Sequence, residues 1–466
     1  MKAAIRFILI APALSFLTLA GAATDRPNIV FLVADDLGYG EVGCYGQELI
    51  RTPNIDRLAR EGMRFTQFYA GCSVCAPSRS TLMTGQHTGH TPVRDNGGGR
   101  HLNAEDFTTA EMLKQAGYTT GGFGKWGLGT EDSAGAPWKQ GFDQFFGCLH
   151  QVHAHFYYPY WLWTNGARYY LPENEGHHRA RYSHDEIHKH ALEFIRTQKS
   201  RPFFCYLPYT LPHVELVAPE DSVKPYRGRW KETPLPDPRP GYIGAEEPYA
   251  AFAGMVSRLD RSVGEVLALL EELKLASNTV VVFTSDNGPQ GDQWKRVADF
   301  FHGAGPLRGY KGGLYEGGIR VPLIVRWPGK VRADSSTDHI GGFWDILPTL
   351  AQIAGAFPPS RIDGISFVPT LLGQAQRSHE FLYWELPAGK GYAAAVRLGD
   401  WKAVRPRPLA PLELYNLKND LAEQKNVAAE HPEVMEKVRA ILTRAHTDER
   451  TYPPEFRKVG IRDYVR

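Results

Sequence analysis

Two continuous apolar runs dominate the hydrophobic pattern of the chain, and each run ends abruptly at acidic or amide side chains. Residues 29–33 (Ile-Val-Phe-Leu-Val) are followed by Asp35 and Asp36, and residues 280–283 (Val-Val-Val-Phe) by Asp286 and Asn287. Runs of β-branched and aromatic residues predict strands buried on both faces, as in parallel sheets covered by helices. Both polar groups are therefore expected at the carboxyl ends of strands.

Helical and strand-like segments alternate along the first 376 residues. Helices are predicted for residues 52–60, 108–115, 183–197 and about 248–273, and further strands for residues 118–123 and 203–207, with Lys125 in the loop after residue 123. This order predicts an α/β fold with a large, mostly parallel sheet flanked by helices. Ligands bind at the carboxyl ends of such strands, so we expect the two polar groups to converge on one site.

The pattern changes near residue 377 to shorter runs. Short strands are predicted at residues 380–385, 393–397, 401–405 and 412–415, followed by a helix over about 432–445. Such a series predicts a smaller antiparallel sheet with one packed helix. We therefore assign residues 24–376 to a large domain that carries the site and residues 377–466 to a C-terminal subdomain.

The first 23 residues have a pattern of charged, apolar and small residues that differs from the rest of the chain. Lys2 and Arg6 precede an apolar run over residues 7–19, and the small residues 20–23 offer a cleavage site. The run is too short for a comfortable membrane span. Residues 1–23 are therefore predicted to be a signal peptide, and the protein is expected to be exported to a periplasm or to the outside.

Composition narrows the choice of function. The 466 residues are 42% hydrophobic, which is enough for a sizeable core. The 53 basic residues nearly balance the 51 acidic ones, which gives no support to nucleic-acid binding or to a polybasic membrane surface. Apart from Cys75, four cysteines remain, and an oxidising compartment would permit pairs among them, although unpaired buried thiols fit the sequence at least as well.

The segment Cys75-Ala76-Pro77-Ser78-Arg79 places a thiol beside a predicted helix start. Pro77 suits the first helical position, so Cys75 is expected just outside the first turn. The N–H groups of residues 76–79 and the helix dipole would favour an oxyanion there, and Arg79 could form a fork on it. Taken alone, such a segment is more typical of a buried structural cysteine near a capped helix, but here the motif does not stand alone.

The polar groups after the two apolar runs supply only oxygen ligands. Three carboxylates and one amide carbonyl, from Asp35, Asp36, Asp286 and Asn287, suit a hard divalent cation such as Ca²⁺ or Mg²⁺ and argue against a zinc site. The alternative is that Asp35 and Asp286 only cap the turns that follow them. Two matching strand ends together with the cysteine segment favour the metal site.

With these motifs the chain resembles the formylglycine-dependent, arylsulfatase-like sulfatases, a family of the alkaline phosphatase superfamily. The matching segments, in order, are residues 28–40, 75–79, 82–85, 124–126, 213, 286–288, 309–311 and 316–322. The resemblance implies an alkaline-phosphatase-like fold and the hydrolysis of sulfate esters.

The resemblance also implies a nucleophile and a metal. Cys75 would be converted by a formylglycine-generating maturation enzyme to an aldehyde, whose hydrate attacks sulfur and later expels sulfate. A Ca²⁺ ion, or Mg²⁺, would be held by the two strand-end pairs together with the hydrate at residue 75, and would polarise the nucleophile and a sulfate oxygen.

By the same resemblance, basic residues complete the site. Three carboxylates outweigh one divalent ion, so an anionic ester needs local cations, and Arg79, Lys125 and Lys311 are the matching positions. His213 corresponds to the histidine that touches the sulfate and can protonate the leaving oxygen.

One position departs from the family pattern. The family often has Lys-Trp-His in the second basic segment, where its histidine bonds the hydrate and takes its proton, but this chain has Gly127 there. The replacement candidates, which could also contact substrate, are His153, His155 and His302. A histidine among aromatic residues is, however, more often packed than catalytic.

The sequence does not determine which sulfate ester is the substrate. Aromatic residues at positions 157–163 could form a wall for a sugar ring, or could pack on the sheet. By analogy we favour a sulfated galactose or N-acetylgalactosamine unit of a polysaccharide. The alternatives are a phosphoester or phosphonate ester hydrolase on the same scaffold, and a non-catalytic protein that binds sulfated glycans.

Overall fold

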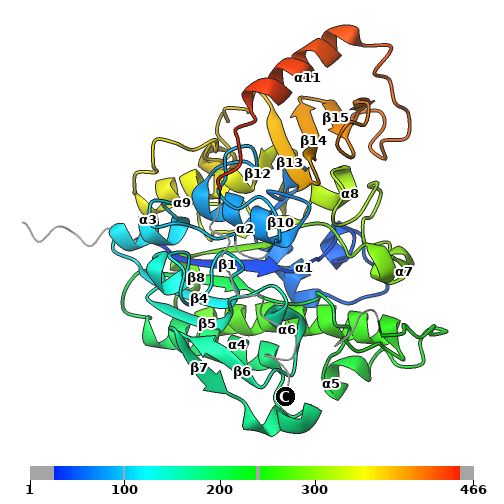
Figure 1. Cartoon of the computed structure of the whole chain (residues 1–466). Coiled ribbons are helices and arrows are strands. Elements are labelled where there is room, and N and C mark those ends of the chain that lie inside the picture. Colours follow the sequence, from blue (N-terminus) through cyan, green and yellow to red (C-terminus); the bar gives the residue numbers. More distant parts are fainter. Residues whose placement is uncertain (1–25, 98–99, 238–241, 452–466) are drawn as a thin grey trace, which may run out of the picture.

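A ten-stranded sheet forms the centre of the larger part of the protein (Figure 1). The computed structural model describes residues 26–97, 100–237 and 242–451, so the predicted signal peptide lies outside the described residues. The strand order is β11 (Ser335–Thr337), β2 (Met63–Phe65), β10 (Leu323–Arg326), β9 (Thr279–Ser285), β1 (Asn28–Ala34), β8 (Phe203–Pro208), β4 (Thr119–Lys125), β5 (Gln144–Cys148), β6 (Trp161–Thr164) and β7 (Ala167–Tyr170). The five strands from β9 to β5 are parallel, whereas β10, β6 and β7 run antiparallel to their neighbours. The predicted large and mostly parallel sheet is confirmed.

Strand β1 shows why the sheet needs helices on both faces. Its side chains alternate between two buried cores, with Val30 and Leu32 in one and Ile29 and Phe31 in the other. This is the period of two that a strand buried on both faces requires. The first core is shared with α1 (Pro53–Arg60), α4 (Ser183–Thr197) and α6 (Pro248–Glu272), and the second with α2 (Cys75–Thr84), α3 (Thr109–Gln115) and α9 (Ile346–Ala354).

The helix boundaries follow local signals. The Thr108 hydroxyl accepts a hydrogen bond from the Glu111 backbone N–H, and the Glu111 carboxylate accepts one from the Thr108 N–H, which caps α3 reciprocally. Helices α1 and α6 both carry proline at the start, where a missing N–H costs no helical hydrogen bond. One placement was wrong: Lys125 is the last residue of β4 and not part of the following loop.

The C-terminal subdomain is a four-stranded antiparallel sheet covered by one helix, as predicted. Its strands are β13 (Leu382–Ala388), β14 (Gly391–Leu398), β15 (Trp401–Arg405) and β16 (Glu413–Asn416), and α11 (Pro432–Arg444) packs on them. In Figure 1 this unit, coloured orange and red, lies beyond one face of the large sheet. The domain boundary at residue 377 stays a prediction.

Short strands and α-helices lie between these elements. They are the paired strands β3 (Phe68–Tyr69) and β12 (Gly341–Gly342), and the helices α5 (Glu220–Val223), α7 (Lys295–Phe300), α8 (Glu316–Ile319) and α10 (Val368–Leu371). All five cysteines are described and none is joined to another, which agrees with the alternative of unpaired thiols.

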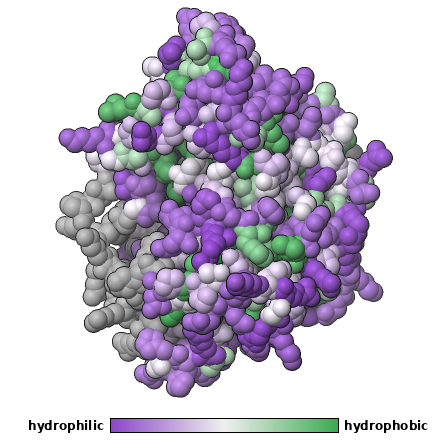
Figure 2. All heavy atoms as spheres, turned by 90° about the vertical axis from the view of Figure 1, so that its right-hand side faces the viewer, coloured by the Kyte–Doolittle hydropathy of each residue, from purple (hydrophilic) through white to green (hydrophobic). Residues whose placement is uncertain are grey.

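The surface carries mainly hydrophilic residues on the face shown in Figure 2, with hydrophobic residues in small groups between them. In the parts of the chain that the structure describes, no helix combines the length and the apolar character needed to cross a membrane.

Candidate active site

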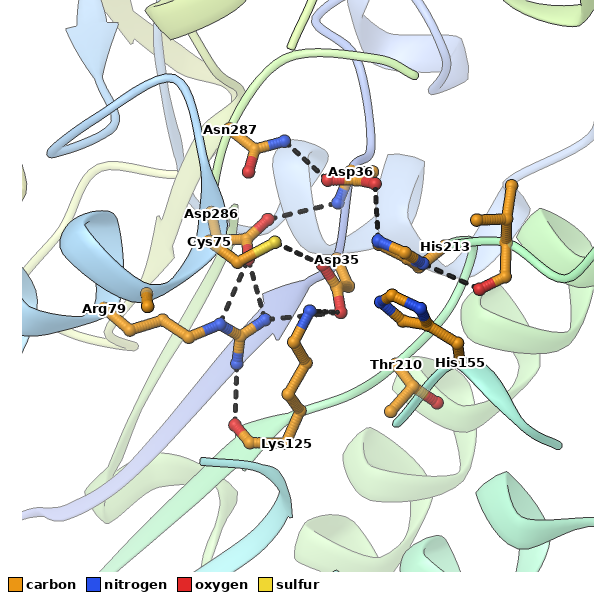
Figure 3. A network of polar contacts seen from close by, with 12 residues as sticks. Asp35, Asp36, Cys75, Arg79, Lys125, His155, Thr210, His213, Asp286 and Asn287 are labelled. Atoms are coloured by element: carbon orange, nitrogen blue, oxygen red, sulfur yellow. Dashed lines mark hydrogen bonds and ion pairs between the residues drawn. The ribbon is translucent and has the colours of Figure 1, made fainter. Parts of the chain in front are cut away.

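The two acidic groups meet at one rim of the large sheet, as the sequence predicts (Figure 3). Strands β1 and β9 are parallel neighbours in register, with Ala34 opposite Ser285. Asp35 and Asp286 each follow the last residue of their strand, and the Asp36 N–H donates to Asp286 Oδ1 (3.1 Å). Both strands end at the same edge because they run in the same direction.

Helix α2 brings Cys75 to this rim. The Sγ atom lies 3.6 Å from Asp35 Oδ1, and the side chain is 1% exposed. Burial raises the pKa of the Cys75 thiol to about 12, although Lys125 and Lys311 act against that shift. The thiol is therefore protonated at neutral pH.

The expected helix start at Cys75 was partly wrong. The helix begins at Cys75 itself, and Pro77 is its third residue. Proline is tolerated there because no N–H group of the first turn has an acceptor within the helix. The Ala76 N–H donates to Asn96 Oδ1 (2.8 Å), and the Ser78 N–H donates to the Val74 carbonyl (3.3 Å). These N–H groups therefore do not all remain available to an anion.

Arg79 is buried behind the nucleophile position and holds two strands together. Its Nε and Nη2 donate to Asp286 Oδ2 (3.1 and 2.8 Å), and its Nη1 donates to the Lys125 carbonyl (2.7 Å). In this arrangement its fork orients a carboxylate, which a lysine ammonium could not reproduce.

Two lysines pair with the two aspartates that follow β1. Lys125 Nζ lies 2.6 Å from Asp35 Oδ2 and is fully buried, and Lys311 Nζ lies 2.7 Å from Asp36 Oδ2. We call the whole group the rim cluster, which comprises Asp35, Asp36, Cys75, Arg79, Lys125, His213, Asp286, Asn287 and Lys311. Its three carboxylates and three cations balance, so a divalent ion would give it a net positive charge suited to an anionic ester.

His213 faces Lys311 and Asp36. Its Nδ1 lies 2.7 Å from the Val214 carbonyl and must donate there, so Nε2 accepts from Lys311 Nζ (3.0 Å). Burial, reinforced by Lys311 and Lys125, lowers the pKa of His213 well below its usual range. The imidazole is thus neutral here, and protonation of the leaving oxygen by His213 stays a prediction.

The two aspartates after β1 titrate very differently. Burial opposes the ionisation of Asp35, but Lys125 and Arg79 outweigh it and lower its pKa to about 2. Burial raises the pKa of Asp36 to about 6, because Lys311 offsets only part of it while Asp35 and Asp286 repel the charge. Lys311 therefore compensates the charge of Asp36 only in part, and an added cation would stabilise its ionised form.

The donor atoms fit a hard cation. The Asn287 amide nitrogen donates to Asp36 Oδ1 (2.6 Å) and to the Gly288 carbonyl (2.9 Å), while its Oδ1 is buried and has no hydrogen-bond partner among the described residues. Ligand atoms of Asp35, Asp36, Cys75 and His213 all lie within 4.8 Å of one another. An unpaired amide oxygen beside two carboxylates is the ligand type that Ca²⁺ and Mg²⁺ prefer.

The three histidines proposed to replace the side chain missing at position 127 lie in different places. His155 reaches the rim cluster: its ring stacks on His213 at 4.2 Å between centroids, and its Nδ1 lies 2.5 Å from the Tyr242 hydroxyl (Figure 3). His153 is fully buried, with Nε2 2.9 Å from the Trp161 carbonyl, and burial lowers its pKa to about 3. His302 is exposed and lies beside Asp299.

The geometry therefore does not support His153 or His302 as the missing base or as substrate contacts. The reason for His153 is packing, since its ring lies against the Trp161 ring at 4.4 Å between centroids. His302 follows α7, and its side chain points into solvent and not into the buried cluster. His155 remains a candidate contact, because it lies against His213.

The aromatic segment 157–163 is mostly packed and does not form an open wall. The Tyr157 hydroxyl donates to the carbonyls of Thr210 and His213 (both 2.7 Å), and Trp161 and Trp163 are buried. Of the two readings that the sequence left open, packing on the sheet describes these residues. Tyr157 instead supports the loop that carries His213.

Two amide side chains near the rim cluster were missed from the sequence. Gln290 Nε2 donates to Asp36 Oδ2, and Asn96 Oδ1 accepts from the N–H next to Cys75. Gln290 lies only four residues after Asp286, a spacing that could have drawn attention to it. Asn96 precedes a run of glycines, and such a pattern by itself predicts only a loop.

Comparisons with known proteins agree with this geometry. The family model Sulfatase matches residues 27–356, and the model for the C-terminal region of N-sulphoglucosamine sulphohydrolase matches residues 310–450. Human arylsulfatase A is 34% identical over 422 residues, covering 82% of this chain and 76% of that protein. The N-acetylgalactosamine-6-O-sulfatase of Bacteroides thetaiotaomicron is 28% identical over 507 residues, covering 92% and 94% of the two chains.

A solved structure shares the fold over most of the chain. The crystal structure of Ps i-CgsB in complex with k-i-k-neocarrahexaose superposes with a TM-score of 0.78 and is 28% identical. The match covers 90% of this chain and 93% of that one, so it includes both the large sheet and the C-terminal subdomain.

Proposed function

The chain belongs to the sulfatase family, within the alkaline phosphatase superfamily, and we propose that it hydrolyses a sulfate ester on a sulfated sugar. One observation carries the proposal: a buried cysteine, three carboxylates and three cations from segments far apart in sequence meet at one rim of the sheet. This set can bind a divalent cation and an anionic ester at the same place.

We propose that the working nucleophile is an aldehyde hydrate made from Cys75. A thiol whose pKa is about 12 is protonated at neutral pH and is both a weak nucleophile and a poor ligand for a hard cation. Oxidation to formylglycine by a maturation enzyme would replace sulfur with oxygen, and the hydrate offers two hydroxyl groups. One hydroxyl loses its proton and attacks sulfur, which breaks the ester S–O bond and releases the alcohol. Loss of the proton from the other hydroxyl then regenerates the aldehyde and expels sulfate.

The residues around position 75 have distinct tasks in this proposal. Lys125 and Lys311 would bind sulfate oxygens, and Arg79 would hold Asp286 in place. His213 would lie at the leaving oxygen, and its Nε2 would pass to that oxygen a proton taken from the Lys311 ammonium. The residues that would hold Ca²⁺ or Mg²⁺ are Asp35, Asp36, Asp286 and Asn287 with residue 75, and the ion would supply Lewis-acid polarisation.

For the substrate we favour a sulfated galactose or N-acetylgalactosamine unit. What supports this choice is the name of one relative, an N-acetylgalactosamine-6-O-sulfatase that aligns with 92% of this chain. His155, beside His213, is the side chain best placed to contact the sugar next to the sulfate. We also propose export of the protein, on the basis of residues 1–23 alone.

Two measurements on protein from its own host test the proposal. Peptide mass analysis around residue 75 should find the mass of an aldehyde in place of the thiol. The same preparation should release sulfate from an aryl sulfate much faster than phosphate from the matching aryl phosphate. A strong preference for phosphate would contradict the sulfatase assignment, and glycan binding without turnover by protein that carries the aldehyde would favour a non-catalytic role.

A further inference from the structure

The side chain of Gln151 occupies the space of the side chain that is absent at position 127. A Cβ atom built on Gly127 would lie 2.2 Å from Gln151 Nε2, well inside contact distance. The backbone fixes this arrangement, because the Gly127 N–H donates to the Leu149 carbonyl (3.0 Å) and the Trp126 N–H to the Cys148 carbonyl (2.9 Å). The segment that carries Gln151 therefore runs directly alongside the segment that begins with Lys125.

The Gln151 amide is buried and unpaired. Both Nε2 and Oε1 are inaccessible to solvent, and neither forms a hydrogen bond to any residue that the structure describes. A buried amide without partners is costly, and most buried polar groups in folded proteins are paired. Next to the active site, a bound group can supply the missing partners of this amide.

A small cavity next to the nucleophile position provides room for that group. Gln151, Gly127, His150, Asn96 and Ala76 line it, and its volume is about 40 Å³. A void of roughly 10–15 Å³ by this measure already holds one water molecule, so the cavity has room for a hydroxyl group. Asn96 connects the cavity to the nucleophile, because its Oδ1 accepts from the N–H of Ala76, the residue after Cys75.

We propose that Gln151 is a binding residue that holds a hydroxyl group of the reacting complex, in the position left open by Gly127. The hydroxyl accepts from Nε2 and donates to Oε1, which satisfies both amide atoms at once. It comes either from the hydrate at residue 75 or from the sugar that carries the sulfate. The inference rests on the proposed function, and it gives Gln151 no proton-transfer role because an amide does not titrate in this range.

The test compares Gln151→Ala and Gln151→Leu with wild type on two substrates, a sulfated sugar and a simple aryl sulfate without sugar hydroxyls. Leucine keeps most of the side-chain volume, so it separates the polar role from the packing role. All proteins are first shown by mass analysis to carry the aldehyde at residue 75. A failure of maturation or of all sulfatase activity in wild type would count against the proposed function and not against Gln151.

We expect a loss in kcat/KM of about tenfold in both variants, the size of one to two hydrogen bonds. A loss of kcat on both substrates assigns the hydroxyl to the hydrate at residue 75. A loss confined to the sulfated sugar, seen mainly in KM, assigns it to the substrate. Unchanged kinetics on both substrates in a folded variant would overturn the proposal.

Gly127→Ala provides an independent probe. The added Cβ must push the Gln151 amide out of its place, so this variant should show the same loss in a wild-type background. In the Gln151→Ala background it should have little further effect, because the displaced group is already gone. Gly127 has φ +80°, which strains alanine in both backgrounds. Equal losses of activity in the two backgrounds would therefore be caused by backbone strain, and would contradict the proposal that the added Cβ acts by displacing the Gln151 amide.

Discussion

Two groups of buried charges in this molecule differ in the balance between their carboxylates and their cations. The rim cluster lies at the carboxyl ends of β1 and β9. The second group, here called the bridging cluster, lies between the large domain and the C-terminal subdomain and consists of Glu316, Arg320, Arg397, Lys402 and Glu423. In it Lys402 Nζ lies 2.9 Å from Glu316 and 3.2 Å from Glu423, and Arg320 Nη1 lies 3.1 Å from Glu316.

The difference lies in the number of cations that face the acids. Burial opposes the charge of Glu316, but Lys402, Arg320 and Arg397 outweigh it and lower its pKa to about 2. Asp36 in the rim cluster is equally buried, yet its pKa rises to about 6. Burial, together with Glu316, likewise raises the pKa of Glu423 to about 7, so each cluster contains an acid of low pKa and an acid of raised pKa. The bridging cluster has three cations for two carboxylates, whereas the rim cluster has three cations for three carboxylates, so a further cation is better accommodated in the rim cluster. A raised carboxylate pKa therefore does not by itself identify a functional site; in the rim cluster it coincides with Cys75 and with the buried, unpaired Oδ1 of Asn287.

The largest expected effect removes the nucleophile from the rim cluster. Cys75→Ala should lower kcat on an aryl sulfate by on the order of 10⁴-fold or more, because no aldehyde can form at that position. Its thermal unfolding should stay close to wild type. Cys44→Ser, a half-buried cysteine outside the cluster, is the matched control and should keep its activity. Substantial turnover by Cys75→Ala would contradict the proposal of a covalent intermediate at residue 75.

The matching change in the bridging cluster should act on stability instead. Lys402→Met leaves Glu316 and Glu423 buried without their shared cation, which should cost about 3–5 kcal/mol of unfolding free energy. Chemical denaturation measures this loss, and kcat per folded molecule should change little. A variant as stable as wild type would show that the bridging cluster is not needed to hold the subdomain.

Adding metal should separate the two clusters directly. Ca²⁺ at one hundred times its Kd should stabilise the wild-type protein by about 3 kcal/mol through binding to the folded state. Asp36→Asn should lose this effect, whereas Lys402→Met should retain it relative to its own metal-free state. Calorimetric thermal unfolding with and without chelator gives the comparison. Equal stabilisation of wild type and Asp36→Asn would place the ion elsewhere.

A subtler change tests the geometry of the rim cluster. Arg79→Lys keeps the charge but removes the fork that donates twice to Asp286 Oδ2 and once to the Lys125 carbonyl. We expect about a 10- to 100-fold loss in kcat/KM, typical for residues that orient metal ligands. Near-normal kinetics would show that charge and not orientation is the contribution of Arg79.

The smallest effect concerns pH and the bridging cluster. Because the pKa of Glu316 falls from 4.5 in the unfolded chain to about 2 in the fold, its stabilising contribution is complete above about pH 4.5. As pH falls from about 4.5 towards 2, this contribution to the free energy of unfolding is lost, by on the order of 1–3 kcal/mol. Urea unfolding at a series of pH values should show this slope, and Glu316→Gln should flatten it. An equal slope in the variant would assign the effect to other carboxylates.

The sequence determined the local elements of this protein and much of its chemistry. The runs at residues 29–33 and 280–283 are long, continuous and β-branched, so they had to form strands buried on both faces, and the acids that follow them had to lie at one edge. The helix over residues 183–197 was placed correctly because its apolar residues repeat with helical spacing. These signals are local, and a local pattern is visible without the fold.

Only the tertiary structure decided which side chains meet. It brought His155 against His213, buried His153 against Trp161, turned His302 to solvent and filled the space beside Gly127 with Gln151. It also showed that the fork of Arg79 is taken up by Asp286. Such contacts join segments that are distant in the chain, and their partners depend on packing and on the balance of buried charges. The residue type at a single position predicts neither the packing around it nor the balance of buried charges.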